Sequence, residues 1–283
     1  MIRPLMIIVA AILILAAPSG QAQTFSYDGN RWYEIEVSIF SNENARQTSE
    51  RTNPANTTLE YPESVIALTS ASAGFLIPFP DTDPVASIRD SMLPEPGQSA
   101  NFGPRLPGPE GRFRLPDFRR DPFVALGDKQ AAFNAYNQAI SRSSEHRLLF
   151  HAVWRQPVLN RVQATAIQVT GGESLGGHYE LEGSLKFSYN INRVDIDARL
   201  WRTDVDAVAS QFSRQSTSAW TLPPLPVSEE GFSGSLSVPV LYYMNQTRSM
   251  ISNELHFLDH PALGVLVEIR PYQLPELSSF SFD

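Results

Sequence analysis

The sequence contains no cysteine among its 283 residues. Disulfide bonds, thiolate nucleophiles and cysteine metal ligands are therefore excluded together. A lipid attached to a cysteine after a signal peptide is excluded by the same absence, so we expect an unanchored protein. Stability must then come from a packed hydrophobic core, for which the chain is long enough.

Basic side chains are scarce, and lysine is almost missing. The chain has 22 Lys+Arg against 30 Asp+Glu, a net charge of −8, and only Lys129 and Lys186 are lysines. The arginines form no dense basic run. Because an acidic surface repels phosphate polymers, we expect no nucleic-acid partner.

The longest apolar run is short and lies at the N-terminus, from Leu5 to Ala17. Its thirteen residues reach about 20 Å as a helix, against a hydrocarbon core of roughly 30 Å. A charged start, a short apolar run and small residues after it are typical of a secretory signal peptide. We expect residues 1–22 to be removed, leaving a periplasmic protein that begins at Gln23 and has no membrane span; a retained anchor is the alternative.

Regular structure is not expected between Pro78 and Pro122, where ten prolines and four glycines occur in 45 residues. Neither a helix nor a central strand persists in such a composition. We interpret residues 78–122 as a long irregular excursion within a single domain that spans residues 23–283. Such a segment is either a tolerated insertion or a functional loop.

Alternating segments dominate the rest of the chain. In residues 32–40, Tyr33, Ile35, Val37 and Ile39 alternate with polar residues, which predicts a half-buried strand. We expect further strands at three places: residues 146–157, a hairpin at 178–201 turning near 190–193, and a hairpin at 248–272 turning at 258–264.

One helix is expected over residues 128–145, where Phe133, Tyr136 and Ile140 recur at spacings of three and four. Together these elements predict an α+β fold. Its core is a mostly antiparallel β-sheet built from hairpins, with the helix packed on one face. The strand at 32–40 is expected to join the same sheet across the proline-rich excursion.

Catalytic motifs are missing: no GxSxG elbow, Walker loop or dinucleotide glycine pattern follows a strand. The best remaining constellation is His256, Asp259 and His260. An HxxxH spacing brings two imidazoles together on a helix, as in zinc hydrolases. Here Pro261 follows and Phe257 occupies the place of the general-base glutamate, so we expect a hairpin turn with no metal and no cofactor.

Glu180 and Glu182 form the other acidic pair, spaced two apart like the acids on one face of a strand. Paired carboxylates serve glycosidases, but a pair on one strand more often belongs to its solvated outer face. We expect that outer face here.

Ring and guanidinium groups are better suited to binding, because flat rings cover sugar faces and arginine holds carboxylates bidentately. The candidate ligand-binding residues are Trp201, Arg202, Tyr243 and Arg248. Trp201 and Arg202 are expected on the outer side of the strand that buries Leu200. Packing beneath a loop is the alternative for each of the four.

Four segments occur in an order that identifies a family: WYEIEVSIF at 32–40, HRLLFHAVWRQP at 146–157, HYELEGSLKFSYNINRVDIDARLW at 178–201 and RSMISNELHFLDHPALGVLVEIRPY at 248–272. Together they resemble the CsiV family of gammaproteobacterial envelope proteins, and the last segment is the most specific. The resemblance implies a periplasmic peptidoglycan-binding protein that supports wall synthesis. It also implies a partner, an outer-membrane lipoprotein activator of a bifunctional penicillin-binding protein. It carries over no catalytic residue.

Two hypotheses therefore stand. The first is a non-catalytic, wall-binding scaffold protein. The alternative is a periplasmic metal-dependent or carboxylate hydrolase that uses His256, Asp259 and His260. Bound zinc in the purified protein would discriminate between them.

Overall fold

The computed structural model describes residues 31–44, 57–69, 118–119, 121–211, 220–227 and 235–275. The expected signal peptide lies outside these residues. So does the proline-rich excursion, except for residues 118–119 and 121–122.

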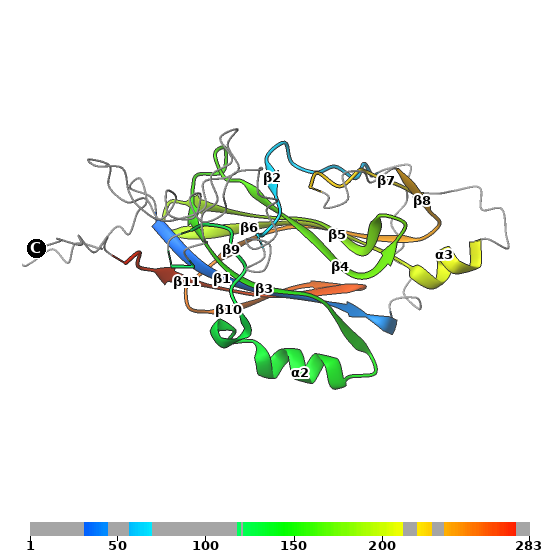
Figure 1. The fold of residues 1–283 in the computed structure, drawn as a ribbon, viewed down its shortest axis with the longest axis horizontal. Helices are drawn as coiled ribbons and strands as arrows, with labels where there is room; N and C mark the ends of the chain where they lie inside the picture. The colour runs from blue at the N-terminus through cyan, green and yellow to red at the C-terminus, as the bar shows by residue number, and fades with distance from the viewer. Residues whose placement is uncertain are drawn as a thin grey trace, which may run out of the picture.

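Two β-sheets face each other and enclose the core (Figure 1). Sheet A has the order β10-β11-β1-β3. Strand β1 (Arg31–Asn42) pairs antiparallel with β11 on one side and with β3 on the other. The strands of sheet A are β1 (Arg31–Asn42), β3 (His146–Val158), β10 (Leu255–His260) and β11 (Leu263–Tyr272).

Sheet B has the order β2-β4-β5-β6-β9 and is antiparallel except for the short β2–β4 pair. Its strands are β2 (Val65–Ile66), β4 (Ala166–Leu175), β5 (His178–Asn190), β6 (Arg193–Thr203) and β9 (Leu241–Met250). The predicted mainly antiparallel fold is thus confirmed. Placing β1 in the same sheet as the 178–201 hairpin was wrong, because the two lie in facing sheets, and strands β4 and β9 were missed.

The core lies between the sheets and is built from the alternating apolar residues of both. From β1 come Ile35, Val37 and Ile39, which are fully buried as their spacing predicted. Sheet B contributes Leu185 and Leu200 to the same cluster. One shared core joins the N-terminal strand to the C-terminal half of the chain.

The outer face of sheet A is covered near its centre by α2 (Asn134–Arg142), seen below the sheets in Figure 1. The helix is shorter than the expected 128–145, because residues Asp128–Gln130 form a separate 3-10 turn, η4. Ser38 of β1 donates to the buried Asn137 of α2 at 2.7 Å. Strand β1 is therefore buried on both faces, whereas the sequence predicted a half-buried strand.

Glu36 of β1 binds the backbone just before the first residue of α2. Its carboxylate, fully buried, accepts the backbone amides of Ala132 and Phe133, each at 2.8 Å. His151 and Arg270 also lie within hydrogen-bond distance of it, at 3.1 and 3.2 Å. Burial by itself would raise the pKa of Glu36, but these hydrogen bonds outweigh it and lower the pKa below its usual value.

A smaller cluster covers one end of the outer face of sheet B. It contains the hairpin of β7 (Trp220–Leu222) and β8 (Leu236–Val238), and α3 (Val205–Gln211) follows β6 nearby (Figure 1). Trp201 and Trp220 lie at the centre of this cluster, and Tyr61 packs on it from the segment before β2.

The two sheets approach each other along both lateral edges. Where β4 meets β3, a Cβ on Gly171 would lie 2.1 Å from the Leu149 carbonyl oxygen, so only glycine fits. On the other side, Gln246 and Arg248 of β9 donate to backbone carbonyls of β10, at 2.7 and 3.1 Å. Within the described residues, no helix is long and apolar enough to cross a membrane.

Candidate functional site

Hydrogen-bonding side chains line the outer face of sheet B beyond the Trp201 cluster. They alternate with core residues such as Ala198 and Leu200, so the strand period places them opposite the core. We call this surface the polar face; it consists of Gln168, Ser184, Lys186, Asp197, Arg199, Tyr243, Asn245 and Thr247.

The register of sheet B arranges the polar face in rows that run across the strands. Arg199 of β6 lies between Ser184 of β5 and Asn245 of β9. Cross-strand neighbours of this kind have their Cβ atoms about 5 Å apart. Ser184 is only 2% exposed, whereas Arg199 and Asn245 are exposed, so a ligand that crosses the strands would meet a guanidinium and an amide in one line.

The next row is held by hydrogen bonds among its own members. Thr247 Oγ1 donates to Asp197 Oδ1 at 2.5 Å, and the Arg161 guanidinium donates to the same oxygen at 3.1 Å. Lys186 Nζ lies 3.4 Å from the Arg161 carbonyl oxygen. The Asp197 carboxylate is therefore largely satisfied and only 9% exposed.

Arg199 differs from its neighbours because its side chain is exposed at the centre of the sheet. Among the residues that the structure describes, none forms an ion pair or a hydrogen bond with its guanidinium. Its charge acts on Tyr243: burial raises the pKa of that phenol, Arg199 opposes the rise, and Glu60 adds to it. The positive charge of Arg199 is thus available beside an aromatic ring.

Trp201 does not lie on an open surface, which corrects the expectation for this residue. Its side chain is fully buried, and Tyr61 packs edge-on against it with ring centroids 4.9 Å apart. Its indole Nε1 donates to Glu182 at 3.3 Å. The alternative interpretation, packing beneath another segment, describes Trp201 correctly.

Glu182 is likewise buried, not solvated as expected. Its Oε1 accepts the Tyr179 amide at 2.8 Å and lies 3.0 Å from His178 Nδ1. Burial raises the pKa of Glu182, and its hydrogen-bond partners offset only part of that rise. The side chain is fully buried and is bound by Trp201.

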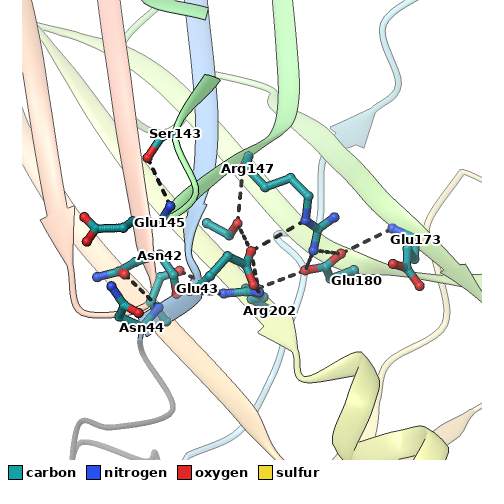
Figure 2. A network of polar contacts seen from close by, with 11 residues as sticks. Asn42, Glu43, Asn44, Ser143, Glu145, Arg147, Glu173, Glu180 and Arg202 are labelled. Atoms are coloured by element: carbon teal, nitrogen blue, oxygen red, sulfur yellow. Dashed lines mark hydrogen bonds and ion pairs between the residues drawn. The ribbon is translucent and has the colours of Figure 1, made fainter. Parts of the chain in front are cut away.

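Arg202 faces the space between the sheets, not the outside. It pairs with Leu181 across β5 and β6 and so shares the face of Leu200, two residues before it. Its Nε donates to Glu180 at 3.0 Å, and its Nη2 donates to both oxygens of Glu43 at 3.1 Å (Figure 2).

Glu180 connects the two sheets in this cluster. Arg147 of β3 donates to both of its carboxylate oxygens, at 2.7 and 2.8 Å, while Arg202 binds it from β6 (Figure 2). Glu180 is fully buried, which contradicts the expected solvated position, and its separate partners leave no acid pair with Glu182. Two guanidinium groups and two carboxylates balance each other, so this cluster stabilises the end of the sandwich.

Tyr243 and Arg248 lie five residues apart on β9 and therefore face opposite sides. Tyr243 is half-buried on the polar face next to Trp201, its partner across the strands. The Arg248 guanidinium is exposed at the β9–β10 edge, where it donates to the Phe257 carbonyl oxygen. Of the four candidate residues, Tyr243 alone belongs to the polar face, and the buried Trp201 lies next to it.

The sequence as a whole matches a known protein family. The family model described as "Peptidoglycan-binding protein, CsiV" matches residues 6–272, nearly the whole chain. The chain belongs to the CsiV family. The family resemblance inferred from four segments is therefore confirmed. Searches of curated proteins and of solved structures found no match.

In this CsiV chain, the histidines of the proposed hydrolase site are held by local contacts. His256 and His260 lie four residues apart on strand β10, a separation of about 13 Å, and Asp259 alternates to the other face. His256 Nε2 accepts the Ile251 amide at 3.1 Å, and His260 Nδ1 accepts the Ala262 amide at 3.2 Å. Within the described residues, no three His, Asp or Glu side chains are grouped to hold a metal ion.

Strand β10 continues to His260, so the turn before β11 is shorter than the expected 258–264. Leu255 and Phe257 are 44% and 42% exposed, while Leu258 is buried and His256 nearly so. Leu258 pairs with Val265 of the core, which sets the phase of this edge strand. Apolar residues therefore remain on its outer side, where Phe257 stacks on Phe40 with ring centroids 6.1 Å apart.

The CsiV polar face contains residues that sequence reasoning missed, above all Arg199, Asn245 and Thr247. The alternation in β6, where Asp195, Asp197 and Arg199 separate core residues, was the available indication. Strand β9 gave less indication, because its register becomes visible only when it pairs with β6. The arrangement supplies a ligand with hydrogen-bond donors and acceptors and with the Arg199 guanidinium, which has no ion-pair partner among the described residues.

Proposed function

We propose that this CsiV-family chain is a non-catalytic periplasmic protein that binds peptidoglycan and supports cell-wall synthesis. In this proposal it acts with an outer-membrane lipoprotein activator of a penicillin-binding protein. Removal of residues 1–22 delivers the mature chain to the periplasm as a single domain without a lipid anchor.

The observation that carries the proposal is the family match, which extends over both sheets of the sandwich and is described as peptidoglycan-binding. The polar face supports a binding role, because it offers hydroxyl, amide and guanidinium groups on a rigid sheet. The local engagement of His256 and His260 gives no support to the hydrolase alternative.

Wall binding is tested by sedimenting the mature protein, residues 23–283, with purified sacculi. We expect the protein to sediment with sacculi and to stay in solution with cellulose particles, which lack both the amino sugar and the stem peptides. Chromatography of the soluble fraction should show no released muropeptides. Equal sedimentation with both particles, or none with sacculi, would contradict the proposal.

The partner is tested separately with the soluble domain of the lipoprotein activator. Mixed with the mature chain, it should elute as a complex in size-exclusion chromatography. Two unshifted peaks at concentrations of about 10 μM would remove the partner from the proposal, because a physiological complex weaker than that is unusual for a standard interface. Wall binding would be unaffected by that outcome.

A further inference from the structure

We propose that the polar face binds the stem peptides of peptidoglycan, with the Arg199 guanidinium paired to a stem carboxylate. The proposal rests on the proposed wall-binding function and names the part of the wall that is recognised. Stem peptides present amides and carboxylates, whereas the glycan presents hydroxyls, acetamido groups and apolar ring faces. The two parts of the wall therefore require different side chains.

The pairing state of the arginines points to Arg199. Arg147, Arg155 and Arg270 each hold a carboxylate at 2.7–3.2 Å, as Arg202 does within the buried cluster. Arg199 also belongs to a strand, yet it is exposed and has no such partner within the part of the chain that the structure describes. An arginine fork that no protein carboxylate occupies is suited to a carboxylate of the ligand.

The neighbours of Arg199 match the amides of a peptide. Asn245 lies beside it on β9 and is exposed, so an amide flanks the guanidinium, and the exposed Thr247 hydroxyl follows two residues further along β9. Tyr243 is two residues from Asn245 on the same face and is half-buried, so part of its aromatic side chain is accessible to an aliphatic group. Such groups suit a short peptide lying across the strands.

Charge complementarity is local and not general, because the whole chain is acidic. The acid of the polar face, Asp197, does not pair with Arg199, because its carboxylate is bound by Thr247 and Arg161. Glu60 is exposed near Tyr243, so its negative charge limits the positive potential around Arg199 on that side. An anionic ligand group is therefore guided to Arg199 and Lys186, within about one Debye length of each other.

The test compares Arg199→Ala with Arg142→Ala on intact sacculi. Arg142 is exposed on α2, against the other sheet, so its loss changes the net charge equally without touching the polar face. We expect Arg199→Ala to weaken binding at least about tenfold, as for a lost charge-assisted hydrogen-bond pair. Arg142→Ala should bind like the parent. Arg199→Lys should retain part of the affinity, because the charge remains without the fork.

Sacculi whose carboxylates have been amidated identify the ligand group. The parent should bind them as weakly as Arg199→Ala binds intact sacculi, and Arg199→Ala should lose nothing further. Undiminished parent binding to amidated sacculi, or to glycan strands stripped of their stems, would overturn the carboxylate assignment. Thermal unfolding of each variant establishes that it is folded, as expected for an exposed position.

The outcomes separate the two proposals. If the parent fails to bind intact sacculi, wall binding itself is wrong. If the parent binds and Arg199→Ala binds equally well, wall binding stands and the polar-face assignment is overturned. The pairing with a carboxylate would also be overturned if Arg199→Ala bound more weakly than the parent by the same factor on intact and on amidated sacculi.

Discussion

Arg202 places a positive charge in the space between the sheets, where its side chain is only 8% exposed. Its carboxylate partners come from both sides: Glu180 from β5, and Glu43 from just beyond β1. A buried charge is tolerated when it is paired and hydrogen-bonded, and it becomes costly when one partner is removed. The role of Arg202 is therefore structural, although its residue type suggested ligand binding.

Arg202→Met should lower the free energy of unfolding by about 3–5 kcal/mol, because Glu180 loses one of its two guanidinium partners while it stays buried. Urea denaturation at neutral pH measures this loss. Arg193→Ala, at the exposed start of the same strand, is the control and should change stability by less than about 0.5 kcal/mol. An Arg202→Met protein as stable as the parent would mean that the cluster contributes nothing to the fold.

Glu36 gives stability a dependence on pH whose sign follows from its pKa. The folded-state pKa lies below the usual 4.5, so folding is favoured above that value and the contribution is lost as pH falls through the folded-state pKa. Glu36→Gln should be less stable at pH 7 by about 1–3 kcal/mol. Its stability should also fall less steeply than that of the parent in acid.

Urea midpoints measured at a series of pH values below 5 test this prediction. The slope should be reduced in Glu36→Gln but not removed, because Glu43 also has a lowered pKa: burial raises it, and Ser41, Arg202 and Arg147 outweigh that effect. Parallel curves for the parent and the variant would show that the Glu36 carboxylate is not held in its charged form.

At the scale of elements, the lateral edges of the sandwich depend on close backbone approach. Strand β4 meets β3 at Gly171, and strand β9 meets β10 through side chains that bind backbone carbonyls. These contacts occupy carbonyls of the edge strand β10 that would otherwise be open to pairing with another chain. The sandwich is therefore closed on both sides by different means.

Gly171→Ala should destabilise the protein by about 1–3 kcal/mol or more, because its Cβ would lie 2.1 Å from the Leu149 carbonyl oxygen and force β4 away from β3. Gly127→Ala is the matched control, since its Cβ would meet only the flexible Gln130 side chain at 3.8 Å. Thermal denaturation of both variants provides the comparison. Equal melting temperatures would indicate that the two strands separate without cost.

At the scale of the whole molecule, the N-terminal strand is held by strands from the far end of the chain. Strand β1 lies between β3 and β11 and pairs with both over nearly its whole length. Its core residues Ile35 and Val37 pack with those of both sheets. Strand β1 is therefore held in the fold by strands that follow the proline-rich segment in the sequence.

Limited proteolysis should cut first between Pro78 and Pro122, where the composition opposes a hydrogen-bonded ladder. The two fragments should nevertheless co-elute in size-exclusion chromatography and separate only in denaturant, because β1 remains paired on both sides. Fragments that separate in native buffer would indicate two independent domains instead of the proposed single one.

The mature protein recovered from the periplasm should begin at Gln23. This follows from the short apolar run at residues 5–17 and the small residues before the proposed cleavage position. Intact-mass spectrometry measures the N-terminus directly. Retention of Met1, or an added acyl mass, would contradict the proposed processing.

Much of the fold was determined by the sequence, through the period of its apolar residues. The alternation in β1, β5 and β6 identified strands and their core faces, since a period of two is enough to define which side is buried. The order of four segments also identified the family. The alternation of side chains and the order of the segments are properties of the sequence itself, so they can be recognised without knowing how the chain folds.

Only the tertiary structure decided which polar residues are buried and which are available. Trp201, Glu180 and Glu182 all occupy positions that a strand pattern marks as outer or terminal, yet other segments cover them. Arg202 and Arg199 are three residues apart on one strand, and one is enclosed by carboxylates while the other is exposed. The burial of a side chain depends on which distant segments pack over its face of the sheet. The alternation of residues within one strand does not predict those segments.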